Sequence, residues 1–400
     1  MKVLHVIPSV ASVRGGPSFA IFAMVKALRE QGVEAEIATT NDNGPELLEV
    51  PLNQRIEYEQ VPVWFFPRFS PRVASVREFA FSSQLTRWLW QNVDEYDLLH
   101  IHAIFSYPST AAKAIARFKR IPYIVRPGGH LCEWSLQQSA AKKQLYLTLI
   151  KRAHLDHCQG IHYTTEQEQQ ESSLSGLQAP GFVIPHGLSL PEPIPDVRYK
   201  LRQLLNVPHD EPVILFMSRL HPKKGLDYLI PALGKLAHQR FTFVLAGSGS
   251  PEYEADVEAL LVSAGIRDRT YLSGFVEGAK KDLLLQGADL FALTSHSENF
   301  GVAVLEAMAA SLPVIVTPGV ALASVVNQHQ VGCVVEQDVA AISTAIDYCL
   351  NHSQQAKEMG NCARQLIREH YSWESVSAQL VKVYTSILHH EQPTAQLSHQ

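Results

Sequence analysis

Short apolar runs alternate with helical stretches along almost the whole chain, in two series. In the first half, the expected strands are Val3–Ile7, Glu34–Thr39, Leu98–Ile101, Tyr123–Val125 and Phe182–Ile184. In the second half, they are Val213–Met217, Thr242–Ala246, Thr270–Leu272, Leu290–Leu293 and Val314–Val316. Strands that alternate with helices form parallel sheets covered on both faces, so the pattern predicts an α/β fold.

The helical stretches separate most of these strands. They lie near residues 17–30, 75–92, 109–119, 139–157 and 165–174, and then near 225–238, 251–263, 278–286, 300–310 and 338–352. A last helix, roughly Trp373 to His389, has apolar residues near helical spacing.

A proline-rich segment divides the two series. Pro185 to Pro195 holds four prolines in eleven residues, which can continue neither a strand nor a helix. A chain of 400 residues also exceeds one ordinary core. We therefore expect one Rossmann-like domain at 1–185, a second at 186–372, and a C-terminal helix with a flexible tail at 373–400. Two such domains would place a cleft between their strand ends.

Composition narrows the function classes. A net charge of −5 disfavours a general nucleic-acid binder, which would show a basic excess. The five cysteines are odd in number and scattered, without metal-binding spacing, which favours free thiols in a reducing cytoplasm. No apolar run reaches the length of a membrane-spanning helix, and Met1 to Pro8 is predicted to be a buried strand rather than a signal peptide.

Two carboxylates, Glu298 and Glu306, flank Gly301 at an expected strand-to-helix turn. The amides of Asn299, Phe300 and Gly301 would be unpaired donors at the helix start, which favours oxygen-rich or anionic groups. Eight helical residues rise about 12 Å, whereas the two carboxyls of a glycosidase lie roughly 5–9.5 Å apart. The spacing suits two parts of one elongated ligand better than a hydrolytic pair. The alternative is two solvated glutamates on a surface helix.

Basic residues follow the first strand of the second half. Ser218, Arg219 and Lys224 lie in this loop, with Lys223 as a substitute for Lys224. A guanidinium fork and a compact ammonium delivered together at a strand end suit a diphosphate, although a loop with solvated charges is the alternative. Gly247 follows the next strand, in a turn that lets the backbone approach a ligand or a neighbouring helix.

The first half offers looser signals. Gly15 and Gly16 precede Pro17 at a helix start, without the spacing of a dinucleotide-binding motif. His102 ends a strand on which His100 shares its face, and a core histidine is the alternative for both. Arg126 and His130 close a further strand, where they could face an acceptor or a phosphate.

These motifs resemble the family-4 retaining glycosyltransferases, which have the GT-B fold of two facing Rossmann-like domains. The resemblance implies that 1–185 is the acceptor-side domain, that 186–372 is the nucleotide-sugar-binding domain, and that the helix in 373–400 crosses back toward the first domain. The resemblance implies that Glu298, Asn299, Phe300 and Gly301 contact the donor sugar and that Glu306 holds the ribose. It also implies roles for residues in the other loops. Arg219 and Lys224 would bind the diphosphate, His102 the donor sugar, Gly15 and Gly16 the reacting end of the donor, Ser218 and Gly247 the donor generally, and Phe275 and Val276 the nucleotide base.

The resemblance implies retaining transfer of a hexosyl unit from a nucleotide diphosphate sugar to an acceptor hydroxyl, in polysaccharide or glycolipid synthesis. No Asp-x-Asp motif occurs, so we expect no metal and no cofactor. The alternatives are a GT-B sugar phosphorylase, a nucleotide-sugar epimerase, and a non-catalytic nucleotide-sugar-binding protein.

Aromatic and basic residues gather between Val61 and Trp90, with Glu78 as the only acid. This composition suits an anionic bilayer surface, where aromatic rings lie among the headgroups and arginines meet anionic lipid. Peripheral contact with the inner face of the plasma membrane is one hypothesis for this segment. A core-facing helix with a proline-rich loop that covers the acceptor cleft is the other.

Overall fold

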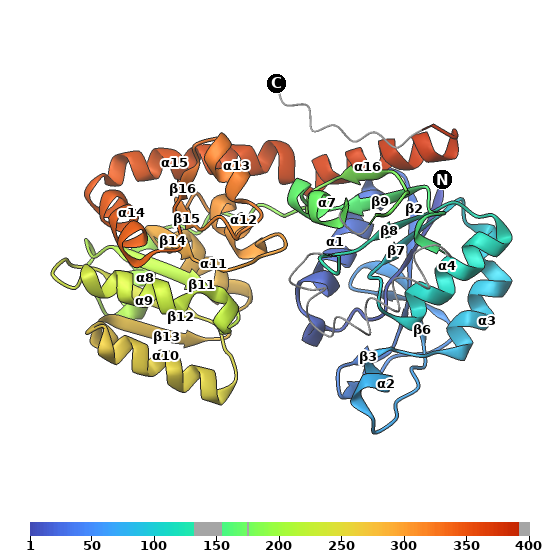
Figure 1. Ribbon diagram of the computed structural model, residues 1–400, viewed down its shortest axis with the longest axis horizontal. Coiled ribbons are helices and arrows are strands. Elements are labelled where there is room, and N and C mark those ends of the chain that lie inside the picture. The colour runs from blue at the N-terminus through green and yellow to red at the C-terminus, as the bar shows by residue number, and fades with distance from the viewer. Residues whose placement is uncertain (132–153, 174–175, 392–400) are drawn as a thin grey trace. The chain divides into compact units, whose positions relative to one another are not determined.

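The computed structural model describes residues 1–131, 154–173 and 176–391, which divide into two compact units (Figure 1). The first unit comprises Met1–Gly187 and Trp373–Gln400, and the second comprises Leu188–Ser372. The helix expected at 139–157 lies almost entirely outside the described residues. Within the described part of the chain, no helix is both long and apolar enough to cross a bilayer.

The first unit is built on an eight-stranded sheet in the order β10-β9-β8-β7-β1-β2-β6-β5. Its strands are β1 (Lys2–Val6), β2 (Glu34–Thr40), β5 (Arg55–Tyr58), β6 (Val61–Phe66), β7 (Leu98–His102), β8 (Tyr123–Arg126), β9 (Gly160–Tyr163) and β10 (Gly181–Val183). All neighbours are parallel except β5 and β6, which pair antiparallel. A separate hairpin is formed by β3 (Asp42–Asn43) and β4 (Glu46–Leu47).

Helices cover both faces of this sheet. They are α1 (Gly16–Glu30), α2 (Ala74–Glu78), α3 (Ser83–Asn92), α4 (Tyr107–Lys119), α7 (Glu166–Ser173) and α16 (Trp373–Leu388). Side chains of α1 and α16 share one apolar core with alternate residues of β1, whereas α3 and α4 share the other. The C-terminal helix therefore completes the core of the first unit.

The second unit has a six-stranded parallel sheet in the order β13-β12-β11-β14-β15-β16. Its strands are β11 (Val213–Met217), β12 (Thr242–Ala246), β13 (Thr270–Gly274), β14 (Leu290–Leu293), β15 (Val314–Val316) and β16 (Gly332–Val334). Its helices are α8 (Val197–Leu205), α9 (Leu226–Lys235), α10 (Pro251–Ser263), α11 (Gly278–Gly287), α12 (Val302–Ala309), α13 (Ala323–Gln328), α14 (Val339–Asn351) and α15 (Ser353–Leu366). One continuous apolar core joins them.

The structure corrects the expected elements in the segment between 61 and 90. Val61–Phe66 is a strand, β6, and five of its six side chains are buried. The helix expected at 75–92 is two helices, because Ala80 adopts a positive φ of 56° and Ser82 caps α3 by accepting from the amide of Leu85. The spacing of apolar and aromatic residues in the sequence reveals neither the positive φ of Ala80 nor the cap at Ser82.

Candidate functional site

Three loops of the second unit meet at the edge where β11, β12 and β14 end. They span residues 218–225, 246–250 and 294–301. The amide of Leu220 donates to the carbonyl of Ser248 over 2.9 Å, and the amide of His296 donates to the carbonyl of Lys223 over 2.9 Å. Backbone hydrogen bonds between the loops therefore fix the positions of the Cα atoms that carry the candidate side chains.

Two glycines make this packing possible. Gly225 has φ +69°, and a Cβ there would lie 1.9 Å from the carbonyl oxygen of Thr294. Gly247 has φ +146°, and a Cβ there would lie 1.9 Å from the carbonyl oxygen of Ser218. A side chain at either position would push the loops apart. The two glycines are therefore needed for the close packing of the loops, and not only to leave space for a ligand.

Lys224 and Glu298 form an ion pair at the centre of these loops. Both are largely buried, with 13% and 16% of their side-chain surface exposed. Glu298 Oε1 accepts from the Lys224 ammonium and, over 3.3 Å, from the hydroxyl of Ser295. Glu298 Oε2 has no hydrogen-bond partner among the described residues. The second carboxylate oxygen can therefore accept from a ligand hydroxyl while the first holds the lysine.

Arg219 lies on the same loop as Lys224 and is exposed, with no ion pair within the described residues. Burial lowers the pKa of His221 between them, and the charges of Arg219, Lys224 and Lys223 lower this pKa further. Three cations of this loop thus act on one imidazole ring. Such a concentration of positive charge at a strand end suits a diphosphate.

Glu306 lies on α12, on the far side of Gly301 from Glu298. Its Oε1 accepts from the ammonium of Lys281 on α11 over 2.8 Å. The predicted start of this helix was two residues too early: Gly301, at φ +88°, precedes the first helical residue, Val302. Asn299 and Phe300 lie before the helix, and the ring of Phe300 is buried in the core. Phe300 can thus offer a ligand its backbone but not its side chain.

Phe275 and Val276 follow β13. Phe275 exposes 71% of its surface, one of the largest fractions among apolar residues described, whereas Val276 is buried. Gly274, at φ +67°, turns the chain between the strand and this ring. An exposed aromatic ring on a rigid turn suits stacking against a flat group such as a nucleotide base.

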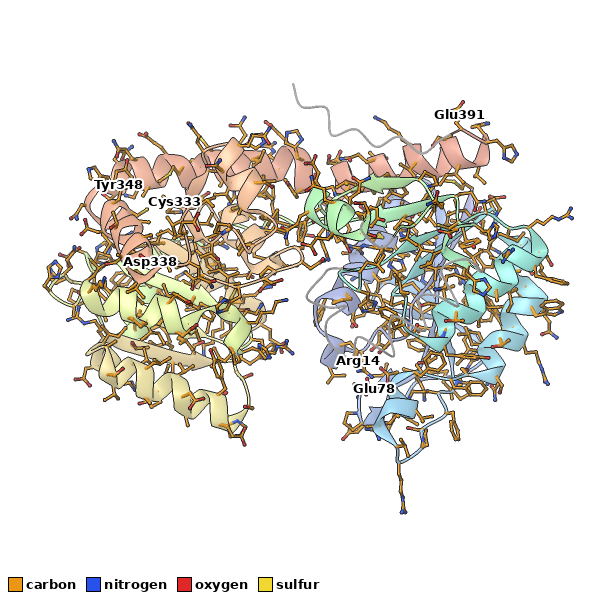
Figure 2. The ribbon with its side chains drawn as sticks, in the orientation of Figure 1. Arg14, Glu78, Cys333, Asp338, Tyr348 and Glu391 are labelled. Atoms are coloured by element: carbon orange, nitrogen blue, oxygen red, sulfur yellow. The ribbon has the colours of Figure 1, made fainter. Side chains whose placement is uncertain are left out.

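In the first unit, Gly15 precedes α1 and Gly16 is its first residue. Gly15 has φ +76°, and a Cβ on either glycine would meet nothing within 4 Å. Arg14, just before them, is not available to a ligand, because its guanidinium bonds both carboxylate oxygens of Asp42 and forms a 2.5 Å ion pair with Glu78 (Figure 2). Arg14 therefore anchors the glycine turn.

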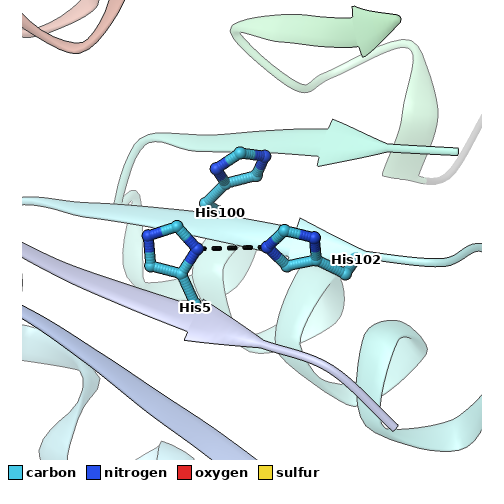
Figure 3. Close-up of side chains that lie close together, drawn as sticks. All are labelled: His5, His100 and His102. Atoms are coloured by element: carbon cyan, nitrogen blue, oxygen red, sulfur yellow. Dashed lines mark hydrogen bonds between the residues drawn. The ribbon is translucent and has the colours of Figure 1, made fainter. Parts of the chain in front are cut away.

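Three histidine rings lie together on the face of the first sheet that α16 covers (Figure 3). His5 on β1 is the register partner of His100 on β7, and strand alternation puts His102 on the same face as His100. The rings of His100 and His102 stack with centroids 4.4 Å apart. His5 Nδ1 and His102 Nε2 share a hydrogen bond of 3.1 Å. All three rings are buried.

The protonation of the next histidines follows from their partners. The carbonyl of Ile184 can only accept, so His162 Nε2 donates to it over 2.9 Å. His162 Nδ1 then accepts from His100 Nε2 over 3.3 Å, and His100 Nδ1 accepts from the hydroxyl of Tyr384 over 2.7 Å. Burial lowers the pKa of His100 and of His162 well below the ordinary value, so both rings are neutral. The sequence-based alternative for His100, a satisfied core histidine, is what the structure contains.

His5, His100 and His102 offer three nitrogens within 4.8 Å of one another, a spacing that a metal ion could use. Their surroundings do not favour one. His100 has both ring nitrogens in hydrogen bonds, and the positive charge of Arg126 acts on all three rings. A dication would have to lie near this guanidinium without a carboxylate in the cluster to compensate it.

Arg126 ends β8 directly opposite His102 in the strand register. His130 lies four residues further on, and its Nδ1 accepts from the amide of Ile104 over 3.3 Å. The structure thus brings His102, Arg126 and His130 to one edge of the first sheet, as expected from the strand ends. It also makes Arg126 a buried residue, with 7% of its surface exposed.

Sequence reasoning missed several partners of the candidate residues. Lys281 and Tyr384 each meet their partner from another element, and no local spacing indicates the contact. Ser295 lies only three residues before Glu298 in the same loop, but its spacing alone does not show that the hydroxyl turns to the carboxylate. His5 did leave a signal, since a histidine in the apolar run of β1 must be buried. The described residues of the second unit place Arg219, Lys224, Glu298 and Glu306 around neighbouring loops.

Solved structures share this architecture. The model aligns with the HepE protein of Anabaena in complex with UDP at a TM-score of 0.78 and 21% identity, covering 96% of this chain and 100% of that one. It aligns with sucrose-phosphate synthase of Thermosynechococcus elongatus at 0.77 and 19%, covering 98% and 100%. The two α/β units therefore define a protein of the GT-B fold class, which confirms the expected fold.

Family models identify the chain more closely. The model described as "Glycosyl transferase 4-like domain" matches residues 15–187, and "Glycosyl transferases group 1" matches residues 197–366. The chain belongs to the group 1 glycosyltransferases and is an enzyme of that kind.

Curated relatives are distant. An uncharacterized glycosyltransferase of Methanocaldococcus jannaschii is 28% identical over 307 residues, which are 73% of this chain and 76% of the relative. A D-inositol 3-phosphate glycosyltransferase of Xylanimonas cellulosilytica is 32% identical over 210 residues, half of each chain. The match thus spans only half the length of the second relative.

Proposed function

We propose that the chain transfers a hexosyl unit from a nucleotide diphosphate sugar to an acceptor hydroxyl, with retention of configuration at the sugar and without a metal ion. The observation that carries this proposal is the Lys224–Glu298 pair beside the exposed Arg219. Cations for a leaving diphosphate and a carboxylate oxygen for a sugar hydroxyl lie in adjoining loops. Fold neighbours solved with UDP or UDP-glucose, and relatives named as sugar transferases, support the same donor class.

The proposed chemistry assigns separate tasks to these groups. Arg219 and Lys224 stabilise the charge that develops on the departing diphosphate, which is the work of a metal ion in enzymes that use one. Glu298 orients the sugar through Oε2, Glu306 accepts from ribose hydroxyls, and Phe275 stacks on the base. In a retaining transfer without a protein nucleophile, the departing phosphate oxygen takes the proton of the attacking hydroxyl on the same face.

A donor panel tests the proposal. Thermal shift with UDP-, GDP-, ADP- and dTDP-sugars should show stabilisation by one base class. Nucleoside diphosphate should then be released only when an acceptor saccharide is present, since release without an acceptor indicates hydrolysis or epimerase-type chemistry. The anomeric coupling constant of the product, read by NMR, reports retention. A chelator should leave the rate unchanged, and strict dependence on added magnesium or manganese would rule out metal-free transfer.

The rival functions give other results. A sugar phosphorylase would release sugar phosphate from an oligosaccharide with inorganic phosphate and would need no nucleotide. An epimerase would change the sugar of the donor without any acceptor. A binding protein would be stabilised by the donor and turn nothing over.

We also propose that the enzyme works at an anionic membrane surface in cell-surface polysaccharide or glycolipid synthesis, on the cytoplasmic side. Exposed apolar side chains cluster around α2 and its flanking loops, beside the exposed Arg72; they are Phe69, Val73, Val76, Phe79 and Phe81. Arg68, one of the basic residues between Val61 and Trp90, takes no part in this surface. Its guanidinium is fully buried against Asp42 and the carbonyls of Gly44 and Glu46.

Liposome flotation tests membrane contact. The protein should float with anionic but not with neutral vesicles, and the combined replacement Phe69→Ser and Arg72→Glu should abolish flotation. Arg87→Glu on the exposed side of α3 makes the same charge change outside the apolar cluster and should have a smaller effect. Equal flotation with anionic and neutral vesicles would contradict the proposed contact with an anionic membrane.

A further inference from the structure

Arg126 is a buried cation without a direct hydrogen-bond or ion-pair partner among the described residues. Its Nε is sealed from solvent with no hydrogen-bond acceptor, and no ion pair or hydrogen bond of its guanidinium is present within the described residues. Burial lowers the pKa of Arg126 only to about 10, so the group is charged at neutral pH. A buried, uncompensated charge is costly, and proteins keep one where a ligand supplies the opposite charge.

The carboxylate whose charge acts on Arg126 is Glu168 on α7, and both of its oxygens are engaged elsewhere. Oε1 accepts from the amide of Gly129 over 2.6 Å. Oε2 accepts from the amide and the hydroxyl of Thr164, each over 2.8 Å. Glu168 therefore holds the turn that follows Arg126 in place, and its charge acts on the guanidinium through space without a direct ion pair.

The other titratable neighbours are Tyr384, which burial keeps protonated by raising its pKa, and a group of histidines, which carry no negative charge. The charge of Arg126 lowers the pKa of five of them, in each case after burial; they are His5, His100, His102, His162 and His186. Neutral rings add neither a counter-charge nor a second cation, so Arg126 is the cation that this group of described residues offers an anion. Among the described residues, Arg126 therefore has one nearby negative charge, Glu168, but no direct ion-pair partner.

Arg126 lies at the edge of the first sheet where ligands of such folds bind. It ends β8 opposite His102, at the carboxyl edge of a parallel sheet, and the amide of Ala103 donates to its carbonyl over 3.0 Å. Ligands of open α/β sheets bind at this edge. The donor diphosphate already has Arg219 and Lys224 in the second unit, so an anion at Arg126 belongs to another molecule.

We propose that Arg126 binds an anionic group of the acceptor, a phosphate or a carboxylate, so that the acceptor is a phosphorylated or acidic saccharide rather than a neutral one. The assignment of this anion to the acceptor rests on the proposed transferase function. A planar guanidinium binds either anion through two parallel hydrogen bonds, which accounts for an arginine rather than a lysine at the end of β8.

The probes are inorganic phosphate, glucose 6-phosphate, glucuronate and glucose, titrated calorimetrically into the full chain. Glucose is the neutral control, and the comparison of glucose 6-phosphate with glucuronate separates a phosphate site from a carboxylate site. At least one anionic probe should bind at least about tenfold more tightly than glucose, the scale of one charged hydrogen bond.

Arg126→Gln should remove this preference, and Arg126→Lys should retain part of it. Arg87→Gln, which removes the same charge from an exposed position in the first unit, should keep it. Because Arg126→Gln removes an unpaired buried charge, the melting temperature of this variant should equal or exceed that of the unaltered protein. A nitrogen-15 NMR spectrum of the unaltered protein, labelled at arginine, reports the contact with the anion without any substitution. One guanidinium resonance should move on addition of the anion and be absent in Arg126→Gln.

Three results would overturn the proposal. They are equal affinity of the unaltered protein for anionic and neutral probes, undiminished anion binding in Arg126→Gln, and a parallel loss of nucleotide-sugar affinity in that variant, which would give the arginine to the donor. Failure of the transferase function itself is seen separately, as absence of nucleotide binding in the donor panel while anions still bind at Arg126.

Discussion

The ring of His100 on β7 accepts a hydrogen bond from the hydroxyl of Tyr384 on α16, across 284 positions of sequence. Both groups are fully buried, so neither can turn to water if the other is removed. Tyr384→Phe should lower the free energy of unfolding by about 1–3 kcal/mol, the cost of one unsatisfied buried acceptor. Urea unfolding measures this loss. Tyr348→Phe, which removes an exposed hydrogen bond to Gln355, is the control and should change stability by less than about 0.5 kcal/mol.

The first unit should lose stability in mild acid. Burial and Arg126 lower the pKa of His5 and of His186 from 6.5 to about 3 in the folded state. The unfolded chain therefore binds more protons below pH 6.5, so the stability from these rings is complete above that pH and is lost as the pH falls toward 3. Each ring contributes a slope of about 1.4 kcal/mol per pH unit. Urea unfolding between about pH 6.5 and 5, above the range where carboxylates titrate, measures it. A flat profile would mean that the rings are already protonated in the folded protein.

Gly225→Ala should disrupt the candidate donor site through its loops. The new methyl would lie 1.9 Å from the carbonyl oxygen of Thr294, in a residue held at φ +69°. Gly265→Ala is a matched control, because Gly265 has φ +68° and open space within 4 Å. Gly225→Ala should cost about 1–3 kcal/mol of stability beyond the control, the range for overpacking, and should weaken donor binding. Similar losses in both variants would show that backbone strain alone matters.

Lys224 and Glu298 should act as a coupled pair. Under the proposed function, Lys224→Ala and Glu298→Ala should each cost about 2–4 kcal/mol in kcat/KM, as for loss of one preorganised group. Each substitution also releases the other residue from its ion pair. The double variant should therefore lose less than the sum, with a coupling energy of about 0.5–3 kcal/mol. If the losses in kcat/KM of the two single variants simply add in the double variant, Lys224 and Glu298 act independently.

Glu306→Ala should raise KM for the donor more than it lowers kcat, because a ribose contact is made equally in the ground and transition states. Lys281→Ala should have the same effect on a smaller scale, since Lys281 only holds the carboxylate of Glu306. Lys235→Ala removes an exposed lysine of α9 in the same unit and should leave both constants unchanged. A fall in kcat alone for Glu306→Ala would place this carboxylate at the reacting sugar.

The sequence predicts the parallel strands well where an apolar run lies between two clear helices, as for β1 and β11. It fails for β6, where prolines and aromatics hide a buried strand, and for β9 and β16, in which glycine, histidine or cysteine interrupts the apolar run. Local pattern also brings Lys224 and Glu298 to the same edge of a sheet, because both follow strands. It cannot show that they pair with each other, or that Arg68 points inward to Asp42 rather than outward, since those contacts depend on loops packed from distant positions.

The completion of the first unit by α16 has a consequence for the order of folding during synthesis. The side chains that close its core, including Val376, Leu380 and Tyr384, are translated only after the whole of Leu188–Ser372. At about 5–20 residues per second, that interval lasts roughly 10–40 s. Throughout it, the nascent first unit exposes the apolar face that α16 will cover. The second unit can thus finish folding on the ribosome before the first, and the exposed face is where we expect a nascent-chain chaperone to bind.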